Sequence, residues 1–182
     1  MLESETQSLA NTNAIAGLCP ITESNLGDGI FDGVVYRANH GRIGVGTDSN
    51  VRISLSEELR TLEYSLRLQN KGRAIYADEN RSTGRVLFDH AVSGGAQALQ
   101  RESGVIAVGQ VADLIALDAS AVPLIAVEQD QWLDAWIFAS DDGLISDVWS
   151  SGQHLVKDGR HVSRELVERR YRKTLSSLYS RI

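Results

Sequence analysis

The chain has 182 residues, of which 42% are hydrophobic and 23% are charged, so it is long enough for a packed core and lacks the composition of a disordered protein. Its 18 Lys and Arg and 24 Asp and Glu give a formal net charge of −6. The basic side chains are scattered until the final segment, 163–182, which argues against a nucleic-acid surface because such a surface needs clustered positive charge.

A cytoplasmic protein without a membrane partner is expected from three features of the chain. Cys19 is the only cysteine, so no disulfide can form within the chain, and a reducing compartment suits it. Residues 1–10 are polar and acidic and do not resemble a secretory signal. The longest apolar stretch, 114–127, is short and is interrupted by Asp118, so it does not predict a membrane span.

The beginning of the chain alternates helix and strand patterns. A short helix is predicted first, with Gly17 as its stop, and the apolar run 14–20 is typical of a buried strand. A polar loop that contains glycines is predicted at 21–33, and a short stretch with a helical face at 34–40. The run RIGVGTD (42–48) then predicts a second buried strand.

Two longer helices are predicted next. Segment 54–68 carries leucines on one helical face, and an S-x-x-E capping pattern begins at Ser54. After an irregular break, the helical pattern resumes at 82–99. Gly94 and Gly95 weaken this second helix, so we expect them to allow close approach to a neighbouring element.

The second half of the chain changes to short strand patterns. The run VIAVGQVADLIALD predicts two strands around Gly109, and segment 144–162 predicts a hairpin that turns at 151–152. A closing amphipathic helix is predicted at 163–182, with Ser163 as its cap. The apolar residues expected on one face of this helix are Val167, Tyr171, Leu175, Leu178 and Ile182.

This order of elements predicts an α/β fold, with parallel β/α units followed by short strands and a terminal helix. Two buried parallel strands leave backbone groups unpaired at both edges, unless further strands continue the sheet. We therefore expect the chain to be part of a larger structure.

Asp48, which ends the second predicted strand, has two interpretations. An acid after a strand commonly accepts hydrogen bonds from nearby backbone amides and starts a turn. Functional groups of parallel α/β folds also gather at the carboxyl ends of strands, where a carboxylate can bind a metal or accept a proton.

The sequence resembles the amidohydrolase superfamily, which includes metal-dependent deaminases. Its last two β/α units are similar to GLCPITESNLGDGIFDG (17–33), RIGVGTDSN (42–50) and EELRTLEYSLRL (57–68). Its small β-domain is similar to GVIAVGQVADLIALD (104–118) and DVWSSGQHLVKDGRHV (147–162). Within the superfamily, these segments together with LEYSLRL and DAWIF most resemble the formimidoylglutamate deiminase family of histidine degradation.

The resemblance implies the C-terminal portion of a (β/α)8 TIM barrel and strands of a β-sandwich. Residues 1–103 would be the partial barrel with its last two β/α units, 104–162 the partial sandwich, and 163–182 a terminal helix. It also implies a divalent metal, usually zinc, and hydrolysis of N-formimino-L-glutamate to N-formyl-L-glutamate and ammonia. Asp48 corresponds to the family's acid after the eighth strand, which contacts the metal and handles a proton.

The remaining metal ligands that the resemblance implies are missing from this sequence. A catalytic zinc needs about three protein ligands, and the chain has no His-x-His motif. The four histidines do not replace them convincingly: His40 precedes the second strand, His90 is within a helix, and His154 and His161 are expected at the surface of the hairpin. We therefore expect the isolated chain to be inactive.

Several alternatives remain open from the sequence. The chain could be a truncated gene, a proteolytic product or a piece that needs a complementing N-terminal segment, and it could form a homo-oligomer. Its small-molecule substrate could instead be a guanine or adenosine derivative, or the chain could be a non-catalytic remnant. Glu23 and Asn25 are weaker candidates for substrate binding from the loop, and Cys19 is expected to be an inert thiol.

Overall fold

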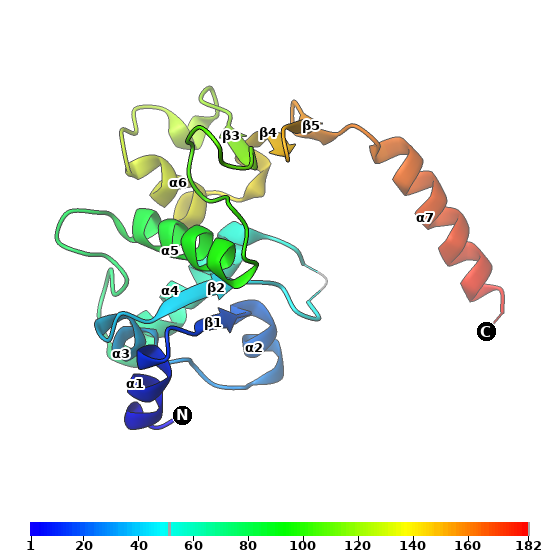
Figure 1. The fold of residues 1–182 in the computed structure, drawn as a ribbon. Coiled ribbons are helices and arrows are strands. Elements are labelled where there is room, and N and C mark those ends of the chain that lie inside the picture. The colour runs from blue at the N-terminus through cyan, green and yellow to red at the C-terminus, as the bar shows by residue number, and fades with distance from the viewer. Residues whose placement is uncertain (51, 182) are drawn as a thin grey trace.

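The computed structural model describes residues 1–50 and 52–181, which form a mixed α/β structure with two separate sheets (Figure 1). The first half contains α1 (Glu3–Asn11), β1 (Ile15–Leu18), α2 (Pro20–Leu26), α3 (Gly33–Ala38), β2 (Arg42–Val45), α4 (Leu55–Asn70) and α5 (Thr83–Ala98). The second half contains β3 (Leu114–Leu117), η1 (Val122–Leu124), α6 (Gln131–Ala139), η2 (Asp142–Leu144), β4 (Ile145–Ser150), β5 (Gln153–Lys157), β6 (Arg160–His161) and α7 (Arg164–Tyr179).

The predicted parallel pair of strands is present. β1 pairs with β2 in parallel, from Ile15 opposite Arg42 to Leu18 opposite Val45. Helix α5 packs on both strands, and a methyl group added at Gly94 would lie only 1.8 Å from the carbonyl oxygen of Ile43. This contact confirms that a glycine in α5 permits close approach to the sheet.

The buried core lies where α4, α5 and α6 meet and under the parallel strands. The predicted leucine stripe of α4 points into it, and Ser54 begins that helix by accepting a hydrogen bond from the N–H of Glu57. The largest fully buried apolar and aromatic side chains are Trp136, Tyr36, Tyr76, Ile43, Leu59, Leu66, Leu87 and Ile137.

The second sheet is antiparallel, in the order β3-β4-β5-β6. The predicted hairpin turns at Ser151 and Gly152, which both have positive φ, as a two-residue turn between right-twisted strands requires. Helix α6 connects this half to the first: Arg60 of α4 donates to the carbonyls of Ile137 and Ser140 at the end of α6.

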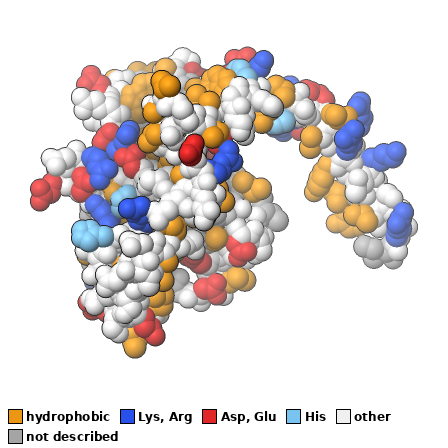
Figure 2. Space-filling model, in the orientation of Figure 1, with side chains coloured by type: hydrophobic (Ala, Val, Ile, Leu, Met, Phe, Trp, Pro, Cys, Tyr) orange, Lys and Arg blue, Asp and Glu red, His pale blue; other side chains and the backbone are white. Residues whose placement is uncertain are grey.

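Helix α7 extends away from the rest of the molecule (Figure 1). Its described residues include none that is buried, and Val167, Tyr171 and Leu178 of the predicted apolar face are exposed. Apolar side chains are visible along this helix in Figure 2. The predicted Ser163 side-chain cap is not formed, and Ile182 lies outside the described residues.

The structure corrects the prediction of a loop over the whole of 21–33. Residues 20–26 form α2, which begins with Pro20 in the first turn and ends at Gly27 in the left-handed conformation. Proline is favourable at the start of a helix and glycine just after its end, so both signals were present in the sequence.

Two further predictions for the second half also need correction. The run around Gly109 contains only one strand, β3, and residues 105–111 form a loop in which Ile106 and Val108 are exposed. A strand requires a neighbouring strand to pair with, and the described residues provide no paired strand for that segment. Helix α6 was not predicted, because its sequence QWLDAWIFA is apolar on most sides rather than along one stripe.

None of the helices formed by residues 1–50 and 52–181 combines the length and the apolar character needed to cross a bilayer.

Candidate functional site

The parallel register brings the carboxyl ends of β1 and β2 to one edge of the sheet. The N–H of Gly46 donates to the carbonyl of Leu18 at 3.0 Å, which extends the pairing one residue beyond β2. Cys19 therefore lies beside Gly46, and the side chain of Thr22 donates to the carbonyl of Thr47 at 2.8 Å. The segments that follow the two strands are thus fixed side by side.

Asp48 lies in the turn after β2 and is exposed to solvent. Its φ of 47° is in the left-handed region, which is uncommon for residues other than glycine and is tolerated by Asp. The turn is closed by the N–H of Asn50, which donates to the carbonyl of Thr47. Within residues 1–50 and 52–181 the Asp48 carboxylate has no hydrogen-bond or ion-pair partner.

Two other acids, Glu58 and Glu23, lie near the same edge. Glu58 of α4 is buried, with 1% of its surface exposed, and one of its oxygens accepts the N–H of Ile21 at 2.8 Å. Its other oxygen is buried without a partner in the part of the chain that the structure describes. Burial raises the pKa of Glu58, and the negative charge of Glu23 adds to the effect.

Cys19 is not activated as a nucleophile. Burial raises the pKa of its thiol, and the charges of Glu23, Asp48 and Glu58 raise the pKa further. A nucleophilic cysteine needs positive surroundings that favour the thiolate. The thiol therefore stays protonated near neutral pH, in agreement with the sequence prediction of an inert cysteine.

Glu23 and Asn25 belong to helix α2 and not to a loop. The carboxylate of Glu23 accepts the N–H of Cys19 at 2.7 Å and so stabilises the beginning of its own helix. Asn25 is exposed on the same short helix. Glu23 therefore has a local capping contact, which is the alternative to substrate binding that the sequence leaves open for Glu23 and Asn25. Neither residue is brought against Asp48 by any hydrogen bond among the described residues.

Residues 3–155 match the amidohydrolase family. The chain belongs to this family. It is 44% identical to the formimidoylglutamate deiminase of Pseudomonas aeruginosa, over 96% of this chain and 39% of that protein. It is 25% identical to a 5-methylthioadenosine/S-adenosylhomocysteine deaminase of Pyrococcus abyssi, over 86% of this chain and 36% of that protein.

Solved amidohydrolase structures have the same fold over this region. An amidohydrolase from Brucella melitensis superposes with a TM-score of 0.91 and 44% identity, over 98% of this chain and 39% of that one. An adenosine deaminase from Xanthomonas campestris with bound zinc gives a TM-score of 0.80 and 22% identity, over 97% and 41%, which shows likeness of fold alone. The chain thus spans about two fifths of the length of these relatives.

The amidohydrolase family is generally metal-dependent, but the residues described in this chain do not fit a zinc centre by themselves. In residues 1–50 and 52–181 no group of three or more His, Cys, Asp and Glu side chains is placed to hold a metal ion. A protein zinc site normally has at least three such ligands. Asp48 can therefore be at most one member of a ligand set.

The histidines of this amidohydrolase chain lie away from Asp48 in the fold. His40 and His90 border a hollow near the start of β2. His161 is exposed on β6, as predicted. His154 is half-buried rather than at the surface: its Nε2 lies 2.7 Å from Asp147 Oδ1, and its ring stacks on Trp149.

Glu58 is the residue near this edge that sequence analysis missed. Its position is one helical turn before Leu62 of the buried stripe, so the four-residue spacing already indicated an inward-facing acid.

Proposed function

We propose that this chain is the C-terminal portion of a metal-dependent amidohydrolase that hydrolyses N-formimino-L-glutamate to N-formyl-L-glutamate and ammonia. The observation that carries the proposal is the 44% identity to a formimidoylglutamate deiminase over 96% of the chain. The TM-score of 0.91 to a solved amidohydrolase at the same identity supports it. The single free thiol is consistent with the proposed cytoplasmic location.

In this proposal β1 and β2 are the last two strands of a (β/α)8 barrel. Residues 1–103 form the barrel portion, 104–162 form part of a β-sandwich, and 163–182 form the terminal helix. The parallel pairing of β1 with β2 and the helices that cover it support this division. The outer edges of this two-stranded sheet are where the remaining barrel strands would pair.

Asp48 is the catalytic carboxylate and metal ligand that this chain contributes. Its support is its position after β2, at the edge where functional groups of parallel α/β folds gather, and its exposed carboxylate. During hydrolysis this carboxylate would accept the proton that the attacking water loses. Glu23 and Asn25, on α2 beside this edge, remain the proposed contacts to substrate.

The isolated chain is proposed to be inactive and to require the rest of the barrel, supplied as a complementing segment or within a homo-oligomer. The support is the lack of a three-residue ligand group among the described residues. An adenosine-type deaminase is the second candidate, and its support is the weaker identity of 25% to the Pyrococcus abyssi protein. A non-catalytic remnant is the third candidate, and its support is again the lack of a three-residue ligand group among the described residues.

A chimera tests the proposed activity. This chain replaces the segment of the Pseudomonas aeruginosa deiminase to which it is similar, and ammonia release is measured with N-formimino-L-glutamate and with 5-methylthioadenosine. We expect release from the first substrate and not from the second, because the chain then completes a deiminase barrel.

The isolated chain is the comparison sample and is expected to release no ammonia. Zinc content and circular dichroism of the chimera establish that it is folded and loaded. A folded, zinc-loaded chimera that deaminates only the adenosine compound would support the second candidate. A folded, zinc-loaded chimera that acts on neither compound would support the third candidate, a non-catalytic remnant.

A further inference from the structure

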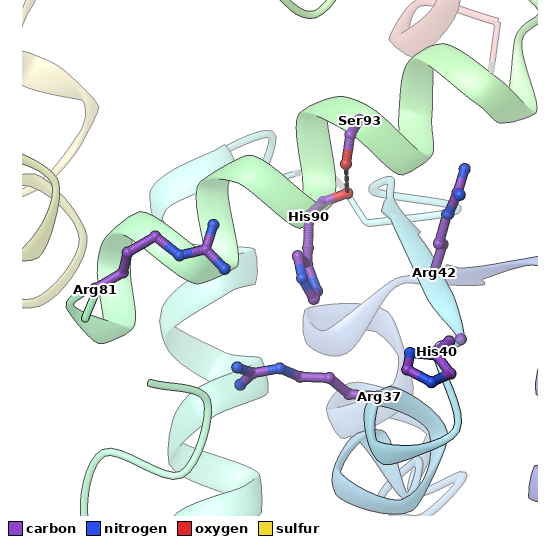
Figure 3. Close-up of a pocket in the computed structure, with 7 residues that line it drawn as sticks. Arg37, His40, Arg42, Arg81, His90 and Ser93 are labelled. Carbon is purple, nitrogen blue, oxygen red and sulfur yellow. Dashed lines mark hydrogen bonds between the residues drawn. The ribbon is translucent and has the colours of Figure 1, made fainter. Parts of the chain in front are cut away.

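A hollow of about 380 Å³ lies between α3, the start of β2 and the middle of α5 (Figure 3). Arg42, which begins β2, borders it, whereas Asp48 follows the other end of that strand. The hollow is therefore separate from the candidate catalytic edge. The ionisable side chains that line it are Arg37, His40, Arg42, Arg81 and His90, and Ser93 adds a hydroxyl group.

The imidazole of His90 points from α5 into this hollow (Figure 3). Its Nδ1 atom is buried and has no hydrogen-bond partner within residues 1–50 and 52–181. The ring is held edge-on to the ring of Tyr76, with centroids 5.6 Å apart. Burial lowers the pKa of His90, and the positive charges of Arg37 and Arg81 lower it further. A buried nitrogen without a partner is unfavourable, and an anionic ligand would satisfy Nδ1 by accepting a hydrogen bond from it when that nitrogen carries the proton.

The charges around the hollow do not cancel. Arg81 is paired with Asp78 and Asp89, and Arg37 Nη2 lies 3.9 Å from Asp78. Arg42 is bonded to the neutral side chain of Gln97 and has no acidic partner in the described part of the chain. Asp89 also pairs with Arg85 at 3.0 Å, so four guanidinium groups share two carboxylates and leave two positive charges. No carboxylate lines the hollow itself. The local potential is positive although the chain carries a net charge of −6.

We propose that this hollow binds a tetrahedral oxyanion, either inorganic phosphate or the phosphate group of a small metabolite. The lining residues come from α3, from β2, from the segment before α5 and from α5 itself, so basic side chains of four segments border the space. A planar carboxylate is satisfied by one guanidinium fork, whereas a phosphate group offers three or more oxygens to separate donors. A phosphate dianion also offsets the two positive charges that the four guanidinium groups leave uncompensated.

Histidine ring signals in NMR spectra of the full chain test this proposal. Inorganic phosphate is titrated in against sodium chloride at the same ionic strength. We expect saturable shifts of the His40 and His90 signals and a rise in the pKa of His90, because a bound anion favours the charged imidazolium. The His154 and His161 signals, from the hairpin, are expected to stay unchanged, and a dispersed His154 signal shows that the chain is folded. The same titration is made on the chimera, so that poor folding of the isolated chain does not decide the result.

Matched variants and ligands complete the test. Arg42→Gln is expected to weaken phosphate binding about tenfold, through loss of a charged hydrogen-bond donor, and Arg169→Gln on α7 is expected to have no effect. Glycerol 3-phosphate distinguishes the two phosphate sources. Tighter binding of glycerol 3-phosphate than of inorganic phosphate would indicate a phosphorylated metabolite, and weaker binding would indicate inorganic phosphate. The proposal would be overturned if sodium chloride shifted the His40 and His90 signals as much as phosphate does. It would also be overturned if Arg42→Gln and Arg169→Gln bound phosphate with equal affinity, or if succinate bound more tightly than phosphate.

Discussion

Glu58 and Glu63 are both fully buried on α4, yet their surroundings differ. Glu63 accepts the backbone N–H groups of Ile75 and Tyr76 and pairs with Arg67 at 2.6 Å. Among the residues that the structure describes, Glu58 accepts only the N–H of Ile21, and burial raises its pKa. A buried charge without full compensation destabilises the folded state, so Glu58 is the weakly compensated acid of this helix.

Replacement of Glu58 by Gln should therefore change how stability depends on pH. Because the folded-state pKa of Glu58 is raised, the folded chain binds more protons than the unfolded chain at pH values above the ordinary carboxyl pKa. The wild-type free energy of unfolding should fall as pH rises from the ordinary carboxyl pKa through the raised pKa of Glu58. In Glu58→Gln the contribution of this carboxyl group to the fall should be absent. Urea unfolding of both proteins at a series of pH values measures it.

Glu63→Gln is the matched control for this measurement. It removes the ion pair with Arg67 and should lower the free energy of unfolding by roughly 1–3 kcal/mol across the pH range. A pH dependence of Glu58→Gln that is identical to that of the wild type would contradict the assignment of Glu58 as the destabilised acid.

At the scale of elements, the contact between α5 and β2 positions the strand that carries Asp48. A Cβ atom at Gly94 would collide with the carbonyl of Ile43, whereas a Cβ atom at Gly95 would meet nothing within 4 Å. The sequence predicted a close approach by this pair of glycines. It could not show which of the two faces the strand, because that depends on the rotation of α5.

Alanine substitutions at these adjacent glycines should have opposite effects. Gly94→Ala should lower the free energy of unfolding by about 3 kcal/mol or more, because α5 must move away from β2. Gly95→Ala should raise it by up to about 1 kcal/mol, since alanine is the better helix former. Chemical denaturation of both variants measures the difference, and a Gly94→Ala protein as stable as Gly95→Ala would show that α5 does not pack as described.

The element predictions succeeded where the pattern was local. The stripe of α4, the glycine-bearing helix α5 and the hairpin turn at 151–152 each follow from spacing within one segment. The strand predicted before Gly109 failed because strand formation depends on a distant partner. Helix α2 was missed although Pro20 and Gly27 marked its two ends, because its seven residues are too few to show a period.

At the scale of the molecule, the two sheets differ in size. In the described part of the chain the antiparallel sheet has four strands, whereas the parallel sheet has only β1 and β2. A parallel pair is normally found inside a larger covered sheet, which agrees with a chain that spans 39% of its deiminase relative. Family membership could be predicted from motifs such as GVGTD. The zinc ligands could not be located, since the described residues bring no ligand group together.

The contribution of Asp48 to the barrel site is the central claim, and kcat of the zinc-loaded chimera with N-formimino-L-glutamate tests it most directly. Asp48→Asn should lower kcat at least about 100-fold, through loss of the group that accepts the proton. Asp158→Asn is the matched control, because Asp158 is also exposed and has a similar φ of 49°, but lies in the β5–β6 turn. It should leave kcat within about twofold, as expected for a surface change remote from the reacting atoms. Equal kcat values for the two variants, both folded and both carrying zinc, would contradict the account.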